Sequence, residues 1–134
     1  MASLLGAFNA QLIKFIEDIS TVLRPADAAE ARQSVSALKL ALRLSPAAAV
    51  GVWRGYAQLY AEDIAAGDIQ SFIHRDYAGV LKDRDTSWLA ACEKIRKCAE
   101  YLDVGDQKKT MGYVQLLTRL ATMYDAERVR SKQA

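Results

Sequence analysis

Proline, glycine and cysteine are all scarce in this chain of 134 residues, which holds two, seven and two of them. So few turn-forming residues disfavour a β-sandwich, and no run approaches the roughly 20 apolar residues of a membrane span. With 51% hydrophobic and 25% charged residues, the composition excludes disordered and collagen-like chains. The sequence predicts one compact domain over residues 1–134, with a polar tail at residues 128–134 that frays.

The start of the chain and its thiols indicate where the protein works. Residues 1–18 lack the basic segment and the uninterrupted apolar run of a secretory signal. Cys92 and Cys98 lie six residues apart, so on a helix they point about 120° away from each other, which disfavours a disulfide between them. Free thiols suit a reducing compartment. We therefore expect an intracellular protein that is neither secreted nor membrane-spanning.

Apolar residues recur at helical spacing along most of the chain. One such series has members three or four residues apart throughout, which places them on one helix face: Phe8, Leu12, Phe15, Ile19 and Val22. No segment shows the regular alternation of a strand. The connections between the periodic segments are short, which favours antiparallel neighbours. The sequence therefore predicts an all-α bundle of five long helices and one short helix.

Capping residues set the expected bounds of these helices. Asp27, Ser45 and Asp106 are the expected N-caps, and Asp85 or Thr86 caps the helix that ends near residue 102. Pro25 ends the first helix, and Gly67 ends the third. The short fourth helix starts just after Gly67. The expected helices cover about residues 4–23, 27–44, 46–66, 69–73, 86–102 and 106–129.

Side chains for catalysis or metal binding are sparse. His74 is the only histidine and has Asp76 two residues away as a partner for general-base chemistry, but a hydrogen-bonded surface histidine is the commoner arrangement. Cys92 lies on an apolar stripe, where a thiol stays protonated. The sequence has no Glu-x-x-His repeat, calcium loop or glycine-rich phosphate loop. We therefore expect no catalytic, cofactor-binding or metal-binding residues, and no enzyme.

Positive charge gathers in the last third of the chain. Residues 1–93 hold nine basic and eleven acidic residues, whereas residues 94–134 hold nine basic and five acidic ones. A solvated helix face accounts for such a bias, and weak binding of an anionic partner is the alternative. That alternative is a nucleic-acid-associated accessory role, in which one patch faces the partner: Lys94, Arg96, Lys97, Lys108 and Lys109.

Aromatic residues and one irregular segment favour protein contacts instead. Two Trp and six Tyr are many for a small bundle to hide, and aromatic side chains left at a surface are common interface anchors. An irregular surface segment with apolar groups suits docking. The alternative is a purely structural role, which is favoured over docking for this segment: Gly67 ends a helix, Asp68 caps the next, and Phe72 and Tyr77 cover the bundle end. The candidate docking segment comprises Asp68, Phe72, His74, Asp76 and Tyr77.

Several blocks of sequence carry a resemblance to a known family. The distinctive ones are Phe8-Asn9-Ala10-Gln11-Leu12 and the block Gly67–Tyr77, which holds Gly67-Asp68, Phe72 and Asp76-Tyr77. Ser45-Pro46 lies between them, at a position where the family carries Asn-Pro. Over residues 8–124 the chain resembles small, all-helical, uncharacterised proteins encoded by large DNA viruses of algae and amoebae. It departs from them in its alanine-rich second and third helices, and in having Ser45 where they have Asn. The resemblance implies a viral origin, in the virion or in the host cytoplasm, and transfers no activity.

Taken together, these features predict a non-enzymatic helical protein that acts through protein–protein contacts. With the resemblance, the expected role is that of a virion or assembly-associated component. The expected partner is another protein or a second copy of the chain, with no cofactor and no membrane. Nucleic-acid binding through the basic last third is the alternative hypothesis.

Overall fold

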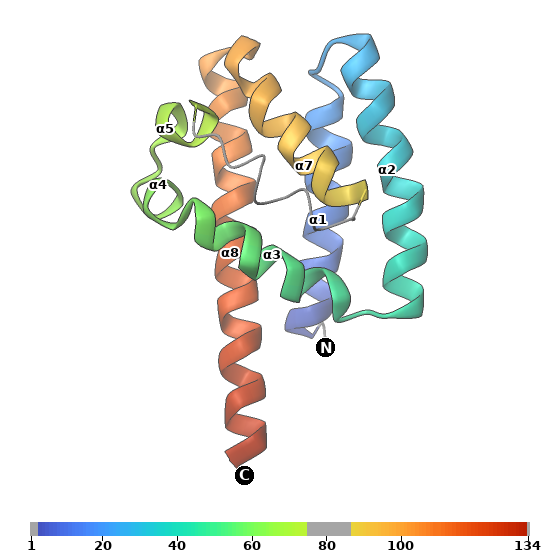
Figure 1. Cartoon of the computed structure of the whole chain (residues 1–134), viewed down its shortest axis with the longest axis vertical. Helices are drawn as coiled ribbons and strands as arrows, with labels where there is room; N and C mark the ends of the chain where they lie inside the picture. Colours follow the sequence, from blue (N-terminus) through green and yellow to red (C-terminus); the bar gives the residue numbers. More distant parts are fainter. Residues whose placement is uncertain (1–2, 75–86, 134) are drawn as a thin grey trace.

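A computed structural model of the chain describes residues 3–74 and 87–133 (Figure 1). Over these ranges every regular element is a helix, which confirms the expected all-α bundle. None of these helices is both long enough and apolar enough to cross a membrane. The elements are α1 (Leu4–Ser20), α2 (Pro25–Leu44), α3 (Ala48–Leu59), α4 (Ala61–Ala66), α5 (Ile69–His74), α7 (Ser87–Cys98), the 3-10 turn η1 (Ala99–Tyr101) and α8 (Val104–Gln133).

Helix α1 is the centre of the bundle. It packs most extensively against α8 and α2 and also touches α7 and α3. Figure 1 shows α1 running antiparallel to both α2 and α8, while α3 crosses α8 and leads into the short helices α4 and α5. The last part of α8 extends past the other helices toward the C-terminus. The expected antiparallel packing is therefore present around α1, and α3 departs from it by lying across the bundle.

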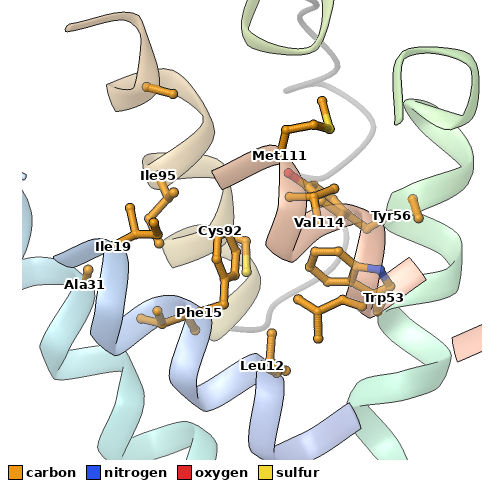
Figure 2. Packing of buried hydrophobic residues seen from close by; sticks show 14 of the residues in the cluster. Leu12, Phe15, Ile19, Ala31, Trp53, Tyr56, Cys92, Ile95, Met111 and Val114 are labelled. Carbon is orange, nitrogen blue, oxygen red and sulfur yellow. The ribbon is translucent and has the colours of Figure 1, made fainter. Parts of the chain in front are cut away.

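The core is built on the predicted face of α1. Phe8, Leu12 and Ile19 are fully buried, whereas Val22 is 39% exposed because α1 ends at Ser20, before the stripe reaches it. Figure 2 shows side chains of α1, α2, α3, α7 and α8 in one cluster. The labelled members are Leu12, Phe15, Ile19, Ala31, Trp53, Tyr56, Cys92, Ile95, Met111 and Val114.

The predicted N-cap of the second helix is wrong. Pro25 is the first residue of α2 and Arg24 its N-cap, with no side-chain capping bond. Proline suits this position because the first turn of a helix has no use for its missing N–H. Asp27 lies inside the helix, where its carboxylate accepts a hydrogen bond from the Tyr101 hydroxyl at 2.9 Å and pairs with Lys94 at 3.1 Å.

The helix expected over residues 46–66 is two helices, α3 and α4. Tyr60 separates them with φ −121° and ψ 20°, outside the helical region. This break leaves the Tyr60 ring 1% exposed. Ser45 makes no side-chain cap, because α3 begins at Ala48 with Ala47 as its N-cap. Gly67 ends α4 as predicted, in the left-handed region at φ 67°, where other residues are strained.

Helix α8 is longer at both ends than predicted. It begins at Val104, and Asp103 Oδ1 accepts the Asp106 backbone N–H at 2.8 Å, so Asp103 and not Asp106 caps the helix. The polar tail is helical to Gln133. No proline or glycine follows Gly112, so nothing in the sequence stops the helix. The preceding α7 ends at Cys98, and its expected caps at Asp85 and Thr86 lie outside the described residues.

Asp103→Ala should destabilise the protein by about 1 kcal/mol, because the substitution removes the capping oxygen at the start of α8. Asp106→Ala is the matched control, since the Asp106 side chain accepts no capping bond. Urea unfolding followed by circular dichroism measures both. Equal losses in the two variants would contradict the assignment of Asp103 as the cap.

Candidate functional site

An open groove of about 590 Å³ lies between α3–α4 and α8. This is within the range of about 300–1,000 Å³ that is usual for binding pockets. Small and apolar side chains make up much of its surface, and polar ones stand around them. The apolar lining residues are Trp53, Ala57, Ala61, Ile64, Ala65, Ala121 and Met123. The polar lining residues are Arg54, Gln58, Gln115, Thr118, Arg119, Thr122 and Asp125.

Both ends of the groove are tied by contacts between its two walls. At one end Arg54 Nη1 lies 3.0 Å from Asp125 Oδ1. At the other, Gln115 Nε2 donates to the Ile64 carbonyl at 2.9 Å. Arg54 is near the start of the α3–α4 wall and Asp125 is the last lining residue of α8. Ile64 is near the end of the α3–α4 wall and Gln115 is the first lining residue of α8, so the two contacts lie at opposite ends of the groove. The Trp53 indole N–H also donates across the groove, to Thr118 Oγ1 at 3.2 Å.

The groove opens onto the exposed end of α8. Met123 and Val129 are 47% and 48% exposed. Arg119 and Arg130 are exposed on the same helix, and Arg119 makes no ion pair or hydrogen bond with another described residue. A second apolar surface lies on the outer side of α2, where Leu40 is 58% and Leu44 79% exposed.

Arg96, a member of the predicted basic patch, is not on the surface. Its side chain is 1% exposed, and its Nε donates to Glu93 Oε2 at 2.5 Å. Its Nη1 donates to the carbonyl oxygens of Phe72 at 2.6 Å and Ile73 at 2.9 Å. Arg96 therefore cannot contact an anionic partner, and its place in the patch is wrong. The sequence held a signal for this, because Arg96 lies four residues after Cys92 on the apolar stripe of α7.

Glu93 is the centre of a polar network that the sequence did not predict. Its two carboxylate oxygens accept hydrogen bonds from the Tyr56 hydroxyl at 3.0 Å and the Tyr60 hydroxyl at 3.1 Å. The Arg96 guanidinium also stacks over the Tyr60 ring, 4.8 Å from its centroid. Burial alone lowers the pKa of Arg96, but the bond to Glu93 and its charge outweigh burial and raise it. Burial and the Glu93 charge raise the pKa of Tyr56.

Two of the predicted surface lysines are held by acidic side chains. Lys94 Nζ lies 3.1 Å from Asp27 and 2.9 Å from Glu30, and these bonds raise its pKa. Lys109 Nζ lies 3.1 Å from Asp18. The remaining members, Lys97 and Lys108, are exposed. The structure therefore does not gather the five basic residues into one free cationic surface.

The candidate docking segment is divided in the structure. Phe72 is 1% exposed and packs edge-on against Tyr60, with the ring centroids 5.2 Å apart. Asp68 Oδ1 accepts the Ser71 backbone N–H at 3.1 Å, as a helix cap does. His74 is exposed at the end of α5. Asp76 and Tyr77 lie outside the described residues. The contacts of Asp68 and Phe72 therefore fit the purely structural role, in which residues of this segment cap a helix and cover the end of the bundle.

The Trp and Tyr side chains that the structure describes are buried or half-buried. Trp53, Tyr56 and Tyr60 are at most 1% exposed. Tyr101, Tyr113 and Tyr124 are half-buried. The hydroxyl of Tyr113 donates to Asp18 at 2.5 Å, and that of Tyr101 to Asp27. No Trp or Tyr whose side chain the structure describes is a free surface anchor.

The thiols and acidic groups form no reactive cluster in the described parts of the chain. Cys92 and Cys98 are both free and buried. Burial raises the pKa of Cys92, so the thiol stays protonated. In residues 3–74 and 87–133, no group of three or more His, Cys, Asp and Glu side chains has an arrangement that could hold a metal ion.

Comparison with known proteins gives no relative from which a role could be transferred. No protein-family model matches the chain, and neither a curated protein nor a solved structure matches it. The class that the structure itself defines is an all-helical bundle with a preformed open groove between α3–α4 and α8.

Glu93→Gln should cost roughly 3–5 kcal/mol of stability, because it leaves the buried Arg96 guanidinium without a counter-charge. Glu100→Gln, an exposed substitution in the adjoining turn η1, is the matched control and should change stability by less than about 0.5 kcal/mol. The double variant Glu93→Leu, Arg96→Met should be more stable than Glu93→Gln alone. Guanidinium unfolding measures all three, and a single variant as stable as wild type would contradict the role of the pair.

Stability should fall below about pH 4 partly through Asp18. The Tyr113 hydroxyl, and then Lys109, hold the pKa of Asp18 below its ordinary value of 3.8. A carboxyl with a lowered folded-state pKa stabilises the fold above its unfolded pKa, and this contribution is lost as pH falls through the folded pKa. In Tyr113→Phe the difference in unfolding free energy between pH 6.5 and pH 3 should therefore be smaller than in wild type. Tyr124→Phe is the control, and an unchanged difference in Tyr113→Phe would contradict the assignment.

Proposed function

We propose that the protein acts by binding another protein, without catalysing a reaction. The partner binds in the groove between α3–α4 and α8 and along the exposed end of α8. The observation that carries this proposal is the groove itself, which is open, partly apolar and held by contacts at both ends. A site formed before its partner arrives loses less conformational freedom on binding, which favours affinity.

The reactive side chains of the chain support a binding role over catalysis. A nucleophile needs a base within hydrogen-bond reach, in a site that substrate can enter. Neither His74 nor Cys92 lines the groove. The Cys92 thiol is buried and protonated, and His74 lies exposed at the end of α5.

A protein partner is better supported than a nucleic acid. Phosphate-backbone binding requires several free cations on one surface. Of the five basic residues in the expected patch, Arg96 is buried and two lysines are paired with carboxylates. Lys97 and Lys108 remain exposed. Within this patch, two exposed lysines supply little of the electrostatic attraction that nucleic-acid binding draws on. The exposed Arg119 and Arg130 of α8 lie outside the patch and flank the apolar Met123, an arrangement that suits a partly apolar protein partner better than a phosphate backbone.

The proposed setting is a virus, as a component of the particle or of its assembly. This part of the proposal rests on the resemblance in three sequence blocks. Two of them touch, since Asn9 Nδ2 donates to the Pro46 carbonyl at 2.9 Å, and the third supplies Gly67 and the buried Phe72.

Photo-crosslinking from inside the groove tests the binding role. A photoreactive amino acid at the groove residue Gln58 should give a discrete protein adduct in infected cells, because the partner covers this position. The same amino acid at the exposed Gln33 of α2 is the control and should not give that adduct. Adducts to nucleic acid alone, or the same adducts from both positions, would contradict the proposal.

Mass spectrometry of purified particles beside infected-cell lysate tests the setting. An abundance in particles comparable to that of structural proteins is expected for a virion component. If the protein is present in lysate but absent from particles, the virion role is wrong. The crosslinking experiment then tests the binding role independently.

A further inference from the structure

We propose that the occupant of the groove is an amphipathic helix of another protein, with acidic residues on either side of its apolar face. This inference rests on the proposed binding function and adds the chemistry of the partner. Helices laid into apolar grooves between other helices are a recurring mode of recognition. Three properties of this groove carry the inference: the size of its wall residues, its open apolar surface and the charges on its rim.

The walls have the shape that a third helix needs. On the α3–α4 side, Ala57, Ala61 and Ala65 lie four residues apart and line the groove. On the α8 side, the small residues Ala121 and Thr122 line the groove. Packed helices lie about 8–10 Å apart, and small residues at the contact allow the closer end of that range. Large apolar side chains of a partner helix can therefore enter between the walls, above Trp53.

An exposed face of α8 that begins at the groove is apolar in its middle and cationic at both ends. Arg119 and Met123 line the groove, and Ala126 and Arg130 continue the same face beyond it. Arg119, Met123, Ala126 and Arg130 follow one another at intervals of four, three and four residues, which is one helix face. All four are exposed. The two arginines are eleven residues apart, which is about 16 Å along the helix axis. A partner helix with carboxylates about three turns apart complements this face.

The same charges disfavour a second copy of this chain as the occupant. When two α8 helices pair antiparallel through this face, Arg119 of each comes close to Arg130 of the other, because the pairing reverses the order of residues. Like charges placed opposite each other cost binding energy. Asp125 offers no relief, since Arg54 already holds it at 3.0 Å. An acidic partner avoids this repulsion.

Selection from an unbiased library tests the inference on the full chain. The probe is a displayed library of 18-residue helical peptides with randomised charged positions around a fixed apolar face. Enriched peptides are expected to carry Asp or Glu on both sides of that face. Arg119→Glu should weaken their binding roughly tenfold, and peptides with Lys in place of the acidic residues should bind this variant better than they bind wild type.

A groove-filling variant separates this inference from the proposed function. Ala61→Phe places a large side chain in the groove at an exposed wall position, and Ala41→Phe on the exposed face of α2 is its matched control. Binding should be lost in Ala61→Phe alone, with circular dichroism and thermal unfolding showing that both variants fold. Enriched peptides that are neutral or basic, and still depend on Ala61, would overturn the acidic partner and leave the binding site standing.

Three other outcomes would overturn both the proposed binding role of the groove and the proposed acidic helix as its occupant. One is that no enriched peptide depends on Ala61. Another is that peptide binding is lost in Ala41→Phe, which would move the site to α2. The third is a dimer, found by sedimentation of the unliganded protein, that Ala61→Phe dissociates, because a second copy would then be the occupant.

Discussion

The buried ion pair of Arg96 and Glu93 is the constraint on which the arrangement of this protein depends. A guanidinium keeps its charge at any ordinary pH, so burying it requires a counter-charge and acceptors for its N–H groups. Glu93 supplies the charge from the same helix, and the carbonyls of Phe72 and Ile73 supply acceptors from α5. The tyrosine hydroxyls of α3 and of the α3–α4 junction complete the shell around Glu93. One charge on α7 thereby fixes the positions of α3, α4 and α5.

The groove follows from this arrangement. Its α3–α4 wall stands where the network around Glu93 places it, and its other wall is α8, which packs along α1. Three contacts then join the walls directly: an ion pair at one end, an amide-to-carbonyl bond at the other, and the Trp53 indole N–H between them. A groove supported in this way has a set width without a partner, which suits the proposed recognition of one helix.

Of the described residues in the two distinctive blocks behind the expected family resemblance, Phe8–Leu12 and Gly67–Tyr77, none lines the groove. The blocks build scaffold: Asn9 ties α1 to the Pro46 carbonyl, Gly67 ends α4 in a conformation that suits glycine, and Phe72 packs beneath Tyr60. The groove is lined by alanines of α3–α4 and by polar residues of α8. Residues that build the scaffold set the fold, whereas the identity of a partner depends on the residues that line the groove.

The sequence by itself determined the helical class, the buried face of α1, the end of α4 at Gly67 and the cap at Asp68, because each depends on neighbours within one or two helical turns. Only the tertiary structure decided that Tyr60 breaks a helix, that Arg96 is buried and that Lys94 and Lys109 face carboxylates. The groove belongs to the same category. A periodic pattern reports which residues share a face, but it does not report which distant helix that face meets. Charges and cavities are therefore assigned by packing between segments that lie far apart in the sequence.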